Sequence, residues 1–417
     1  MVVSVIGLGY IGLPTAAILA SNNIKVFGVD SNKSVVSSLN KGKVHIVEPY
    51  LDLLVQEVIE KGSLKVSIKP KSADVFMIAV PTPFKNKHEP DLSYIRSAVK
   101  DISHVIEKGN MIILESTVPV GTTEKIKKWL LEERSDLSFP SNEKDINISD
   151  INIAHCPERV LPGDVLNELV NNDRIIGGLT NHCSERAKIF YQEFIKGECI
   201  ITDSRTAELS KLVENSYRDV NIAFANELSL ISDKLDINVW ELIKLANHHP
   251  RVNILQPGPG VGGHCIAVDP WFIVDSAPDE AQLIRTARLV NDAKPEFICK
   301  KIEQAVKKTL RNKTELTIVS LGLSFKPNID DLRESPAMII SKKIELMGFK
   351  KSYLCEPNIK SLPSLFDSSK SQLIELNQAL TEADILVLLV DHDEFKNIDI
   401  RLLQSKQVID SRGILEK

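Results

Sequence analysis

The chain has 417 residues, of which 43% are hydrophobic and 26% are charged, and its formal net charge is −5. This length predicts two or three domains of an ordinary globular protein, and the acidic balance disfavours a nucleic-acid or membrane-surface partner. The six cysteines are dispersed and form no C-x-x-C pair, so we expect no metal site, no disulfide scaffold, and reduced thiols in a cytoplasmic protein. Because the apolar N-terminal run is broken by glycines and has no basic start, we expect neither a signal peptide nor a membrane span.

The N-terminal segment follows the order strand, glycine turn, helix, strand. The apolar run Val2–Ile6 ends in the sequence G-L-G-Y-I-G, whose glycines are Gly7, Gly9 and Gly12. In a dinucleotide-binding turn the first glycine permits the bend, the second admits the pyrophosphate and the third lets the helix pack on the strand. A glycine-rich structural turn is the alternative, but the flanking strand and helix patterns favour a dinucleotide site.

Asp30 ends the second apolar run of this segment, Lys25–Val29. A carboxylate at this place accepts hydrogen bonds from both ribose hydroxyls of a dinucleotide and repels a 2′-phosphate. The sequence therefore predicts NAD, rather than NADP, as the cofactor.

Further buried strands alternate with helical stretches and predict a parallel, doubly wound sheet. These strands are Asp74–Val80, Met111–Glu115, Ile151–Cys156 and Arg174–Ile176. Polar loops follow three of them, at Pro81–Pro83, Ser116–Thr123 and Cys156–Gly163. Ligands bind at the carboxyl ends of such strands, so we expect a cofactor and a substrate to meet there. The polar stretch Arg134–Asp150 is expected to be a surface excursion.

The middle of the chain is helical from about Ser204 to Leu235 and again at Val239–Asn247. Lys211, Asn215 and Arg218 share one helix face through their spacing. A solvated polar stripe is the ordinary explanation, but no acid interrupts these two cations and one amide. So long a helical region carries its own packing surface, and we expect a homodimer or a higher homo-oligomer.

The segment Pro257–Pro270 contains four glycines, one histidine, Cys265 and Asp269. Glycines allow a backbone to take positive φ values and to approach a ligand closely. A tight turn with an ordinary buried cysteine is the alternative. The density of glycines around a thiol favours a catalytic Cys265.

The last third of the chain predicts a second α/β domain without the glycine fingerprint. Its strands are Leu316–Leu321, Ser352–Cys355, Ile385–Val390 and Gln407–Ile409. Lys326, Arg333 and Arg412 follow strands and are candidates for phosphate or cofactor contacts, with ordinary surface cations as the alternative. We expect an α/β fold of two doubly wound, Rossmann-like domains joined by a central helical region, at residues 1–200, 201–300 and 310–417.

Six motifs stand in a recognisable order: the glycine fingerprint, S-T-V-P-V-G-T-T, C-P-E-R, Lys-x-x-x-Asn, G-G-H-C and F-K-P-N-I-D-D-L-R-E-S. With them the chain resembles the UDP-glucose/GDP-mannose dehydrogenase family along its whole length. The resemblance implies a nucleotide-sugar substrate, whose C6 alcohol is oxidised to a carboxylate with two NAD, in bacterial surface-polysaccharide synthesis. Four stretches match members acting on UDP-N-acetyl-D-mannosamine: Glu115–Gly121, Asn215–Glu227, His249–Pro270 and Lys326–Ala337.

The resemblance also implies roles for individual residues. Cys265 would be the nucleophile that holds the oxidised carbon, Lys211 and Asn215 would hold the reacting oxygen or a water, and Glu158 would handle protons in hydrolysis, with Asp269 completing the catalytic set. Contacts to the nucleotide sugar are implied for Arg159, Val160, Arg218, His249, Arg251, Gly262, Phe325 and Lys326. Contacts to NAD are implied for Tyr10, Ile11, Asp30, Thr82, Thr117 and Arg333.

One position departs from the pattern of the UDP-glucose enzymes. Val268 stands where they commonly carry a lysine, which weakens UDP-glucose as the substrate and leaves Asp269 in place. The same reaction on UDP-glucose or another nucleotide sugar is the first alternative. A two-electron hydroxyacid dehydrogenase with an idle Cys265, and a non-catalytic nucleotide-sugar sensor, are weaker ones.

Overall fold

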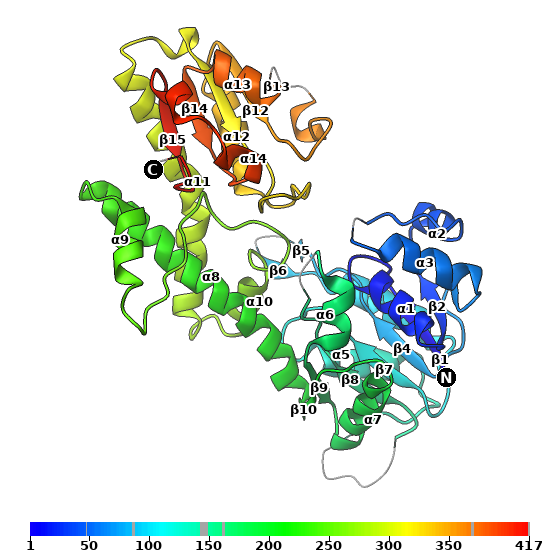
Figure 1. Cartoon of the computed structure of the whole chain (residues 1–417). Coiled ribbons are helices and arrows are strands. Elements are labelled where there is room, and N and C mark those ends of the chain that lie inside the picture. The colour runs from blue at the N-terminus through cyan, green and yellow to red at the C-terminus, as the bar shows by residue number, and fades with distance from the viewer. Residues whose placement is uncertain (47, 86–87, 142–148, 161–162, 368–370, 416–417) are drawn as a thin grey trace. The chain divides into compact units, whose positions relative to one another are not determined.

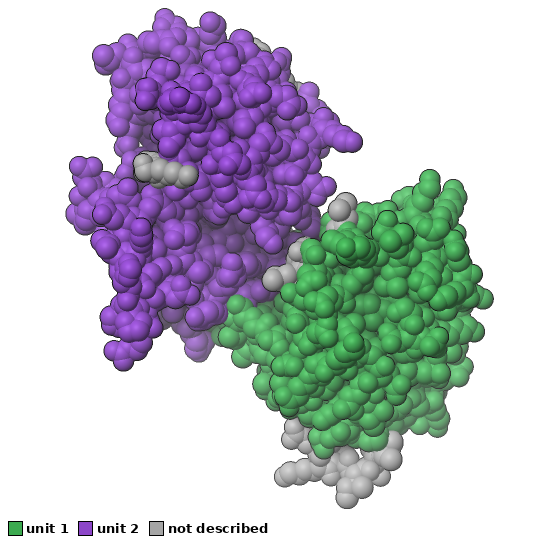
Figure 2. Space-filling view, in the orientation of Figure 1, with its two compact units in different colours: residues 1–214, 271–277 green, residues 215–270, 278–417 purple. Residues whose placement is uncertain are grey.

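The computed structural model describes residues 1–46, 48–85, 88–141, 149–160, 163–367 and 371–415. The chain forms two compact units, coloured separately in Figure 2. Unit 1 comprises residues 1–214 and 271–277, and unit 2 comprises residues 215–270 and 278–417. The three-domain division expected from the sequence stays a prediction.

Unit 1 is built on an eight-stranded sheet with the order β10-β9-β8-β7-β4-β1-β2-β3 (Figure 1). The strands are β1 (Val2–Ile6), β2 (Lys25–Val29), β3 (Leu64–Ser67), β4 (Val75–Ile78), β7 (Met111–Leu114), β8 (Asn152–His155), β9 (Arg174–Gly178) and β10 (Cys199–Asp203). A short antiparallel pair, β5 (Phe84–Lys85) and β6 (Glu89–Pro90), follows β4. Between β1 and β4 the strand order reverses, which is where open sheets of this kind bind ligands.

Helices cover both faces of this sheet, because its strands bury both of their faces. Val75 and Met77 of β4 belong to one hydrophobic core, and Phe76 and Ile78 to the other. The first core is closed by α1 (Gly12–Ser21), α2 (Lys33–Leu39), α3 (Leu51–Glu60), α6 (Val165–Asn171) and α7 (Asn181–Gln192). The second is closed by α4 (Ser93–Ser103) and α5 (Thr122–Glu133). The predicted doubly wound arrangement is confirmed.

The sheet differs from the prediction at one pair of strands. β9 runs antiparallel to β8, with Ala154 opposite Gly178 and His155 opposite Gly177, whereas the sequence pattern predicted a wholly parallel sheet. Antiparallel neighbours need no crossover back to the starting edge. Because of this reversal, β9 begins at the edge where β8 ends.

The central helices are α8 (Ser204–Lys234), α9 (Val239–Ala246), α10 (Asp269–Ser276) and α11 (Gln282–Lys308). The first two confirm the helices predicted from the apolar period, within one residue at each end. Helix α8 begins in unit 1 and ends in unit 2. In the described part of the chain, no helix is long and apolar enough to cross a membrane.

The C-terminal part of unit 2 is a second doubly wound domain, with the parallel strand order β13-β12-β11-β14-β15 (Figure 1). Its strands are β11 (Thr317–Leu321), β12 (Lys351–Cys355), β13 (Gln372–Leu373), β14 (Ile385–Leu388) and β15 (Gln407–Asp410). Its helices are α12 (Pro336–Leu346), α13 (Leu376–Glu382) and α14 (Asp393–Lys396), with 3-10 turns η1 (Lys313–Glu315), η2 (Ser364–Phe366) and η3 (Ile400–Leu403). One core packs α11 and α12 on the sheet, and the other packs α13 and α14 on its opposite face.

Candidate active site

The glycine turn of unit 1 has the geometry of a dinucleotide cradle. Gly7 follows β1 with a φ of +92°, and a Cβ at Gly12 would lie 1.8 Å from the carbonyl oxygen of Gly7. A Cβ at Gly9, by contrast, would have no atom within 4 Å. The third glycine is therefore required by packing, and the second leaves open space in front of the turn. This arrangement fits a pyrophosphate that approaches the N-terminus of α1.

Asp30 lies beside this turn and is half-buried. Its Oδ2 accepts the backbone N–H of Leu8 at 3.0 Å, and its Oδ1 accepts that of Asn32 at 2.8 Å. The carboxylate is thus fixed at the ligand edge of the sheet, as the NAD prediction requires. Tyr10 and Ile11, in the same turn, are also half-buried.

The loops after β4 and β7 meet at the other side of the strand-order reversal. The hydroxyl of Thr82 donates to the carbonyl oxygen of Thr117 at 2.7 Å, and the hydroxyl of Ser116 donates to that of Val80 at 2.7 Å. Unit 1 therefore brings the glycine turn, Asp30, Thr82 and Thr117 to one edge of its sheet. Arg333 belongs to unit 2, where it forms an ion pair of 2.6 Å with Asp331.

The C-P-E-R loop follows β8 and buries an acid. Glu158 accepts the backbone N–H of Arg159 on Oε1 at 2.6 Å, and its Oε2 lies 2.7 Å from a guanidinium nitrogen of Arg174. Arg159 itself pairs with Glu214 at 2.8 Å, and Val160 is half-buried beside them. The remaining residues of the loop, at 161–162, lie outside the described part of the chain. Glu158 is therefore a buried carboxylate that is ion-paired to Arg174.

Helix α8 carries the predicted cation and amide one turn apart. Lys211 is half-buried and belongs to unit 1, whereas Asn215 belongs to unit 2 and donates to Asp269 at 2.5 Å. Arg218 is exposed. The structure thus brings together Asn215 and Asp269 of the predicted catalytic set.

Cys265 differs from the other cysteines of the chain. It is half-buried, whereas the thiols at 156, 183, 199, 299 and 355 are buried. Burial raises the pKa of Cys299 to about 11 and that of Cys355 to about 12, so those thiols stay protonated. The carbonyl oxygen of Cys265 accepts the N–H groups of Val268 and Asp269 at 2.9 and 2.8 Å, at the start of α10. Exposure on a fixed turn is what a nucleophilic thiol needs.

The cysteine loop packs on the loop that follows β11, also in unit 2. Gly263 donates its N–H to the carbonyl oxygen of Arg333 at 3.1 Å. A Cβ at Gly262 would lie 2.6 Å from the carbonyl oxygen of Glu334 and 2.8 Å from the Cβ of Phe325. Gly262 and Gly263 thus join the cysteine loop to Phe325 and to the backbone of Arg333.

A buried polar network that the sequence pattern did not predict holds the start of the cysteine loop. Asn226 accepts the N–H of Gly258 at 2.8 Å and donates to Asn291 at 2.8 Å, and Asn291 donates to Asp219 at 2.8 Å. Arg288 completes this network by donating a hydrogen bond of 2.6 Å to the carboxylate of Asp219. The spacing of seven residues between Asp219 and Asn226 places both on one face of α8, but only their partners on α11 distinguish this face from a solvated one.

The remaining predicted substrate residues belong to unit 2. His249 and Arg251 are exposed after α9, where the N–H of Arg251 donates to the Nδ1 of His249 at 3.3 Å. Lys326 is also exposed. Arg412 forms an ion pair of 2.7 Å with Asp391, and a Cβ at Gly258 would lie 2.5 Å from its guanidinium. Arg412 thus lies against the start of the cysteine loop.

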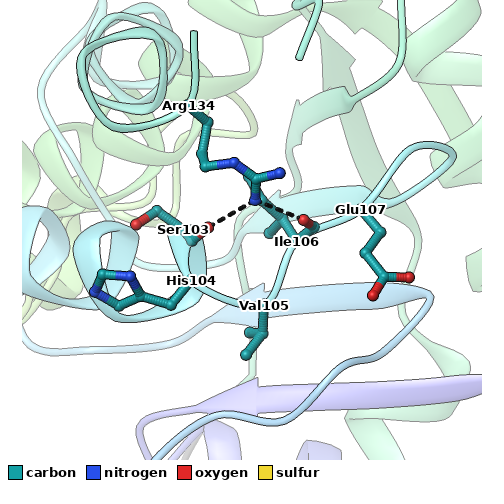
Figure 3. A pocket seen from close by; sticks show the side chains of 6 residues that line it. All are labelled: Ser103, His104, Val105, Ile106, Glu107 and Arg134. Carbon is teal, nitrogen blue, oxygen red and sulfur yellow. Dashed lines mark hydrogen bonds between the residues drawn. The ribbon is translucent and has the colours of Figure 1, made fainter. Parts of the chain in front are cut away.

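A surface recess of unit 1 is a different kind of feature. Figure 3 shows its lining, which consists of Ser103, His104, Val105, Ile106, Glu107 and Arg134. Arg134 donates to the carbonyl oxygens of Ser103 and Ile106 at 2.9 and 2.7 Å and pairs with Asp136 at 2.8 Å. Its guanidinium caps the end of α4, and the recess is structural.

The sequence matches all three domains of one family. Residues 1–195 match the NAD-binding domain of the UDP-glucose/GDP-mannose dehydrogenase family, residues 205–293 match its central domain, and residues 319–417 match its UDP-binding domain. The chain belongs to this family. It is an NAD-dependent nucleotide-sugar dehydrogenase, and the predictions of the family, of its fold and of NAD are confirmed.

Particular relatives carry names for two acetamido sugars. The UDP-N-acetyl-D-mannosamine dehydrogenase of Campylobacter jejuni is 61% identical over 94% of this chain and 96% of its own length. The NDP-N-acetyl-D-galactosaminuronic acid dehydrogenase of Ralstonia nicotianae is 56% identical over 99% of this chain and 96% of its own length. A solved UDP-N-acetyl-D-mannosamine dehydrogenase from Pyrococcus horikoshii superimposes with a TM-score of 0.89 at 38% identity, covering 100% of this chain and 96% of its own.

Proposed function

We propose that this chain oxidises UDP-N-acetyl-D-mannosamine at C6 to the corresponding uronate, in four electrons. The half-buried Cys265, the one thiol of the six that is not buried, carries the proposal, because capture of an intermediate aldehyde requires an accessible nucleophile. The sugar is supported by the name of the 61% identical relative. The product would supply an acidic sugar for a surface polysaccharide.

The proposed reaction divides into oxidation and hydrolysis. NAD, when bound, accepts one hydride from C6 in each oxidation, so two are consumed per sugar. The first oxidation leaves an aldehyde and releases the hydroxyl proton. The thiol of Cys265 adds across its carbonyl and forms a thiohemiacetal, which becomes a thioester when its carbon gives up the second hydride and its hydroxyl gives up a proton. Water then adds to the thioester carbonyl, the C–S bond breaks, and the thiol returns as the uronate forms.

Charged and polar side chains would assist each step. The ammonium of Lys211 and the amide of Asn215 stabilise negative charge on the reacting oxygen, and Asp269 orients the amide through its hydrogen bond. Glu158 takes the proton of the attacking water. The glycine turn and Asp30 hold NAD, while Arg218, His249, Arg251, Lys326 and Arg412 are the cations and imidazole proposed for the nucleotide sugar.

A second candidate substrate is the N-acetylgalactosamine nucleotide. The name of the Ralstonia relative, at 56% identity, refers to an N-acetyl-D-galactosaminuronic acid, which is the C6-oxidised form of that sugar. Both sugars bear an acetamido group at C2, so the chain is expected to turn over either of them faster than UDP-glucose, which lacks this group.

The test is a count of NADH per sugar with a panel of UDP-N-acetyl-D-mannosamine, UDP-N-acetyl-D-galactosamine and UDP-glucose. Two NADH per sugar and the highest kcat/KM with the mannose form are expected. Equal turnover of the three sugars would contradict the substrate, and one NADH per sugar would contradict the four-electron reaction.

Substitution of the thiol tests the mechanism separately. Cys265→Ala should bind both substrates and form almost no uronate, because the small side chain is removed from a glycine-framed loop. Cys265→Ser should accumulate an ester with the mass of the nucleotide uronate, since oxygen esters hydrolyse more slowly than thioesters. Cys299→Ala is the matched control, because that thiol is buried. Wild-type output from Cys265→Ala would contradict the covalent route.

We also propose a homodimer, formed through an apolar stripe on α8. Tyr217, Phe224 and Ile231 are 72%, 52% and 48% exposed and follow one another at intervals of seven residues, which places them on one helix face. Exposed apolar stripes of this kind mark protein interfaces. Phe224→Glu should give a monomer in sedimentation velocity, and Lys234→Glu, at the end of the helix, should not.

A further inference from the structure

Behind Glu158 lies a cluster of buried polar groups that the proposed mechanism does not use. Arg174 and Glu115 are almost fully enclosed, and Tyr191 is completely buried. Arg174 lies 2.7 Å from the Glu158 carboxylate and 3.8 Å from that of Glu115. The hydroxyl of Tyr191 donates to Glu115 at 2.9 Å. One guanidinium therefore faces two carboxyl groups.

The direction of β9 produces this cluster. Glu115 follows β7 and Glu158 follows β8, so both lie at the carboxyl edge of the sheet. Arg174 is the first residue of β9, and only because β9 runs antiparallel to β8 does its beginning lie at that edge. In a wholly parallel sheet the guanidinium would start from the opposite edge.

We infer that Arg174 and Glu115 are positioning residues for Glu158: Arg174 orients its carboxylate, and Glu115, when ionised, competes for the same guanidinium. The inference rests on the proposed role of Glu158 in hydrolysis. A carboxylate that is ion-paired to Arg174 through one oxygen and accepts the N–H of Arg159 on the other is held in one orientation. A second ionised carboxylate on Arg174 would divide the ion pair and loosen that direction.

The other titratable groups around the cluster do not compete with the two carboxyl groups for Arg174, because they stay uncharged. Burial raises the pKa of Cys156 and of Tyr191 far above neutrality, and burial also raises that of Cys199, so these groups stay protonated. Burial, together with the charge of Glu158, raises the pKa of Glu115 to about 7, against the opposing effects of Arg174 and Tyr191. Glu115 thus changes charge near neutral pH.

The test follows the ratio of kcat in Glu115→Gln to kcat in the wild type from pH 6 to pH 9. Glutamine keeps an acceptor for Tyr191 but cannot ionise, so the ratio isolates the titration of Glu115. The ratio should rise several-fold with a midpoint near the pKa of about 7, while the KM values stay within about twofold. The decay of the acyl adduct on Cys265, followed by quenched-flow mass spectrometry, should show the same rise. A ratio that stays flat or falls would overturn the inference.

Two further variants separate positioning from folding. Arg174→Lys keeps the cation but loses the planar fork, so kcat should fall roughly 10- to 100-fold with little change in KM. Tyr191→Phe removes the bond that lowers the pKa of Glu115, so the midpoint of the wild-type profile should move to higher pH. Unchanged profiles in both folded variants would also overturn the inference.

The number of NADH that the wild type forms per sugar distinguishes a failure of this inference from a failure of the proposed function. If it forms no uronate or fewer than two NADH per sugar, the proposed function fails. If it forms two NADH per sugar and the Glu115→Gln ratio is flat, only the positioning role fails.

Discussion

The two doubly wound domains share a topology but use one structural position differently. Each has a glycine with positive φ after its first strand, +92° at Gly7 and +94° at Gly322. Each has an acid after its second strand that accepts N–H groups from the first loop, Asp30 from Leu8, and Glu356 from Leu323 and Ser324. The backbone geometry of the fold thus repeats, because both sheets have the same strand order around the first strand.

The surroundings of the two acids differ. Asp30 is half-buried beside a short glycine turn, whereas Glu356 is buried and lies 3.0 Å from the Nε2 of His392. Asn358 donates to the same carboxylate at 3.1 Å. In the N-terminal domain the acid remains available to a ligand, and in the C-terminal domain protein groups occupy it. The C-terminal loop after β11 instead supports the cysteine loop.

The largest expected effect is a loss of stability on substitution of Gly12, which Gly9 in the same turn should not show. Gly12→Ala should greatly reduce stability or prevent folding, because its Cβ would lie 1.8 Å from a backbone oxygen. Gly9→Ala should keep the melting temperature and weaken NAD binding, since its Cβ meets only the open space in front of the turn. Differential scanning fluorimetry and NAD titration measure the two effects. A loss of stability in both variants would remove the distinction between packing and ligand space.

Substitution of each of the two acids, Asp30 and Glu356, tests this comparison directly. Glu356→Gln should cost about 2 kcal/mol of unfolding free energy, because buried hydrogen bonds to a charged group are lost, with the KM for NAD unchanged. Asp30→Ala should reduce the preference for NAD over NADP by roughly 10- to 100-fold, with a small change in melting temperature. Urea unfolding and cofactor kinetics check both. If Asp30→Ala were the less stable variant, the assignment of roles would be reversed.

The pH dependence of stability should have opposite signs in the two domains. Burial raises the pKa of Glu115 to about 7, so its folded form binds a proton that the unfolded chain releases near 4.5, and stability is lost as pH rises through 7. For Glu356, burial is outweighed by the bonds from His392 and Leu323, which lower its pKa. Its contribution is present above pH 4.5 and is lost as pH falls below that value.

Glutamine variants of both acids measure this difference in urea titrations. Glu115→Gln should become more stable than the wild type by on the order of 2 kcal/mol between pH 5 and pH 8. Glu356→Gln should be less stable at pH 7 and approach the wild type at pH 4. The same pH dependence in both variants would contradict the assignment of opposite shifts.

The smallest expected effect concerns exposed ion pairs. Lys351 lies 2.9 Å from Glu382 and lowers the pKa of Glu382 to about 2, but the side chains are 46% and 31% exposed. Solvent screens such pairs and they contribute little to stability. Lys351→Ala, and Arg96→Ala at the exposed pair with Glu132 in the N-terminal domain, should leave the melting temperature unchanged. A lower melting temperature in either variant would show that the exposed ion pair contributes to the stability of its domain.

Local patterns in the sequence predicted six of the eight strands of the first sheet, four of the five of the second, and the motif loops, but not β3, β10 or β13. Continuous apolar runs predict buried strands because both faces of a doubly wound sheet are covered. The glycine turn with Asp30, and the glycine loop with Cys265, were recognisable because their chemistry lies in adjacent residues. The family, the fold and NAD could all be predicted from these segments.

Only the tertiary structure decided contacts between residues far apart in the chain. The direction of β9, which brings Arg174 to Glu158 and Glu115, has no local signal, since a parallel and an antiparallel strand bury the same apolar residues. The support of Gly262 by Phe325, and of Gly258 by Asn226, likewise depends on how separate elements pack. Periodicity specifies which side of a helix or strand is buried, but the partner on that side is chosen by the whole fold.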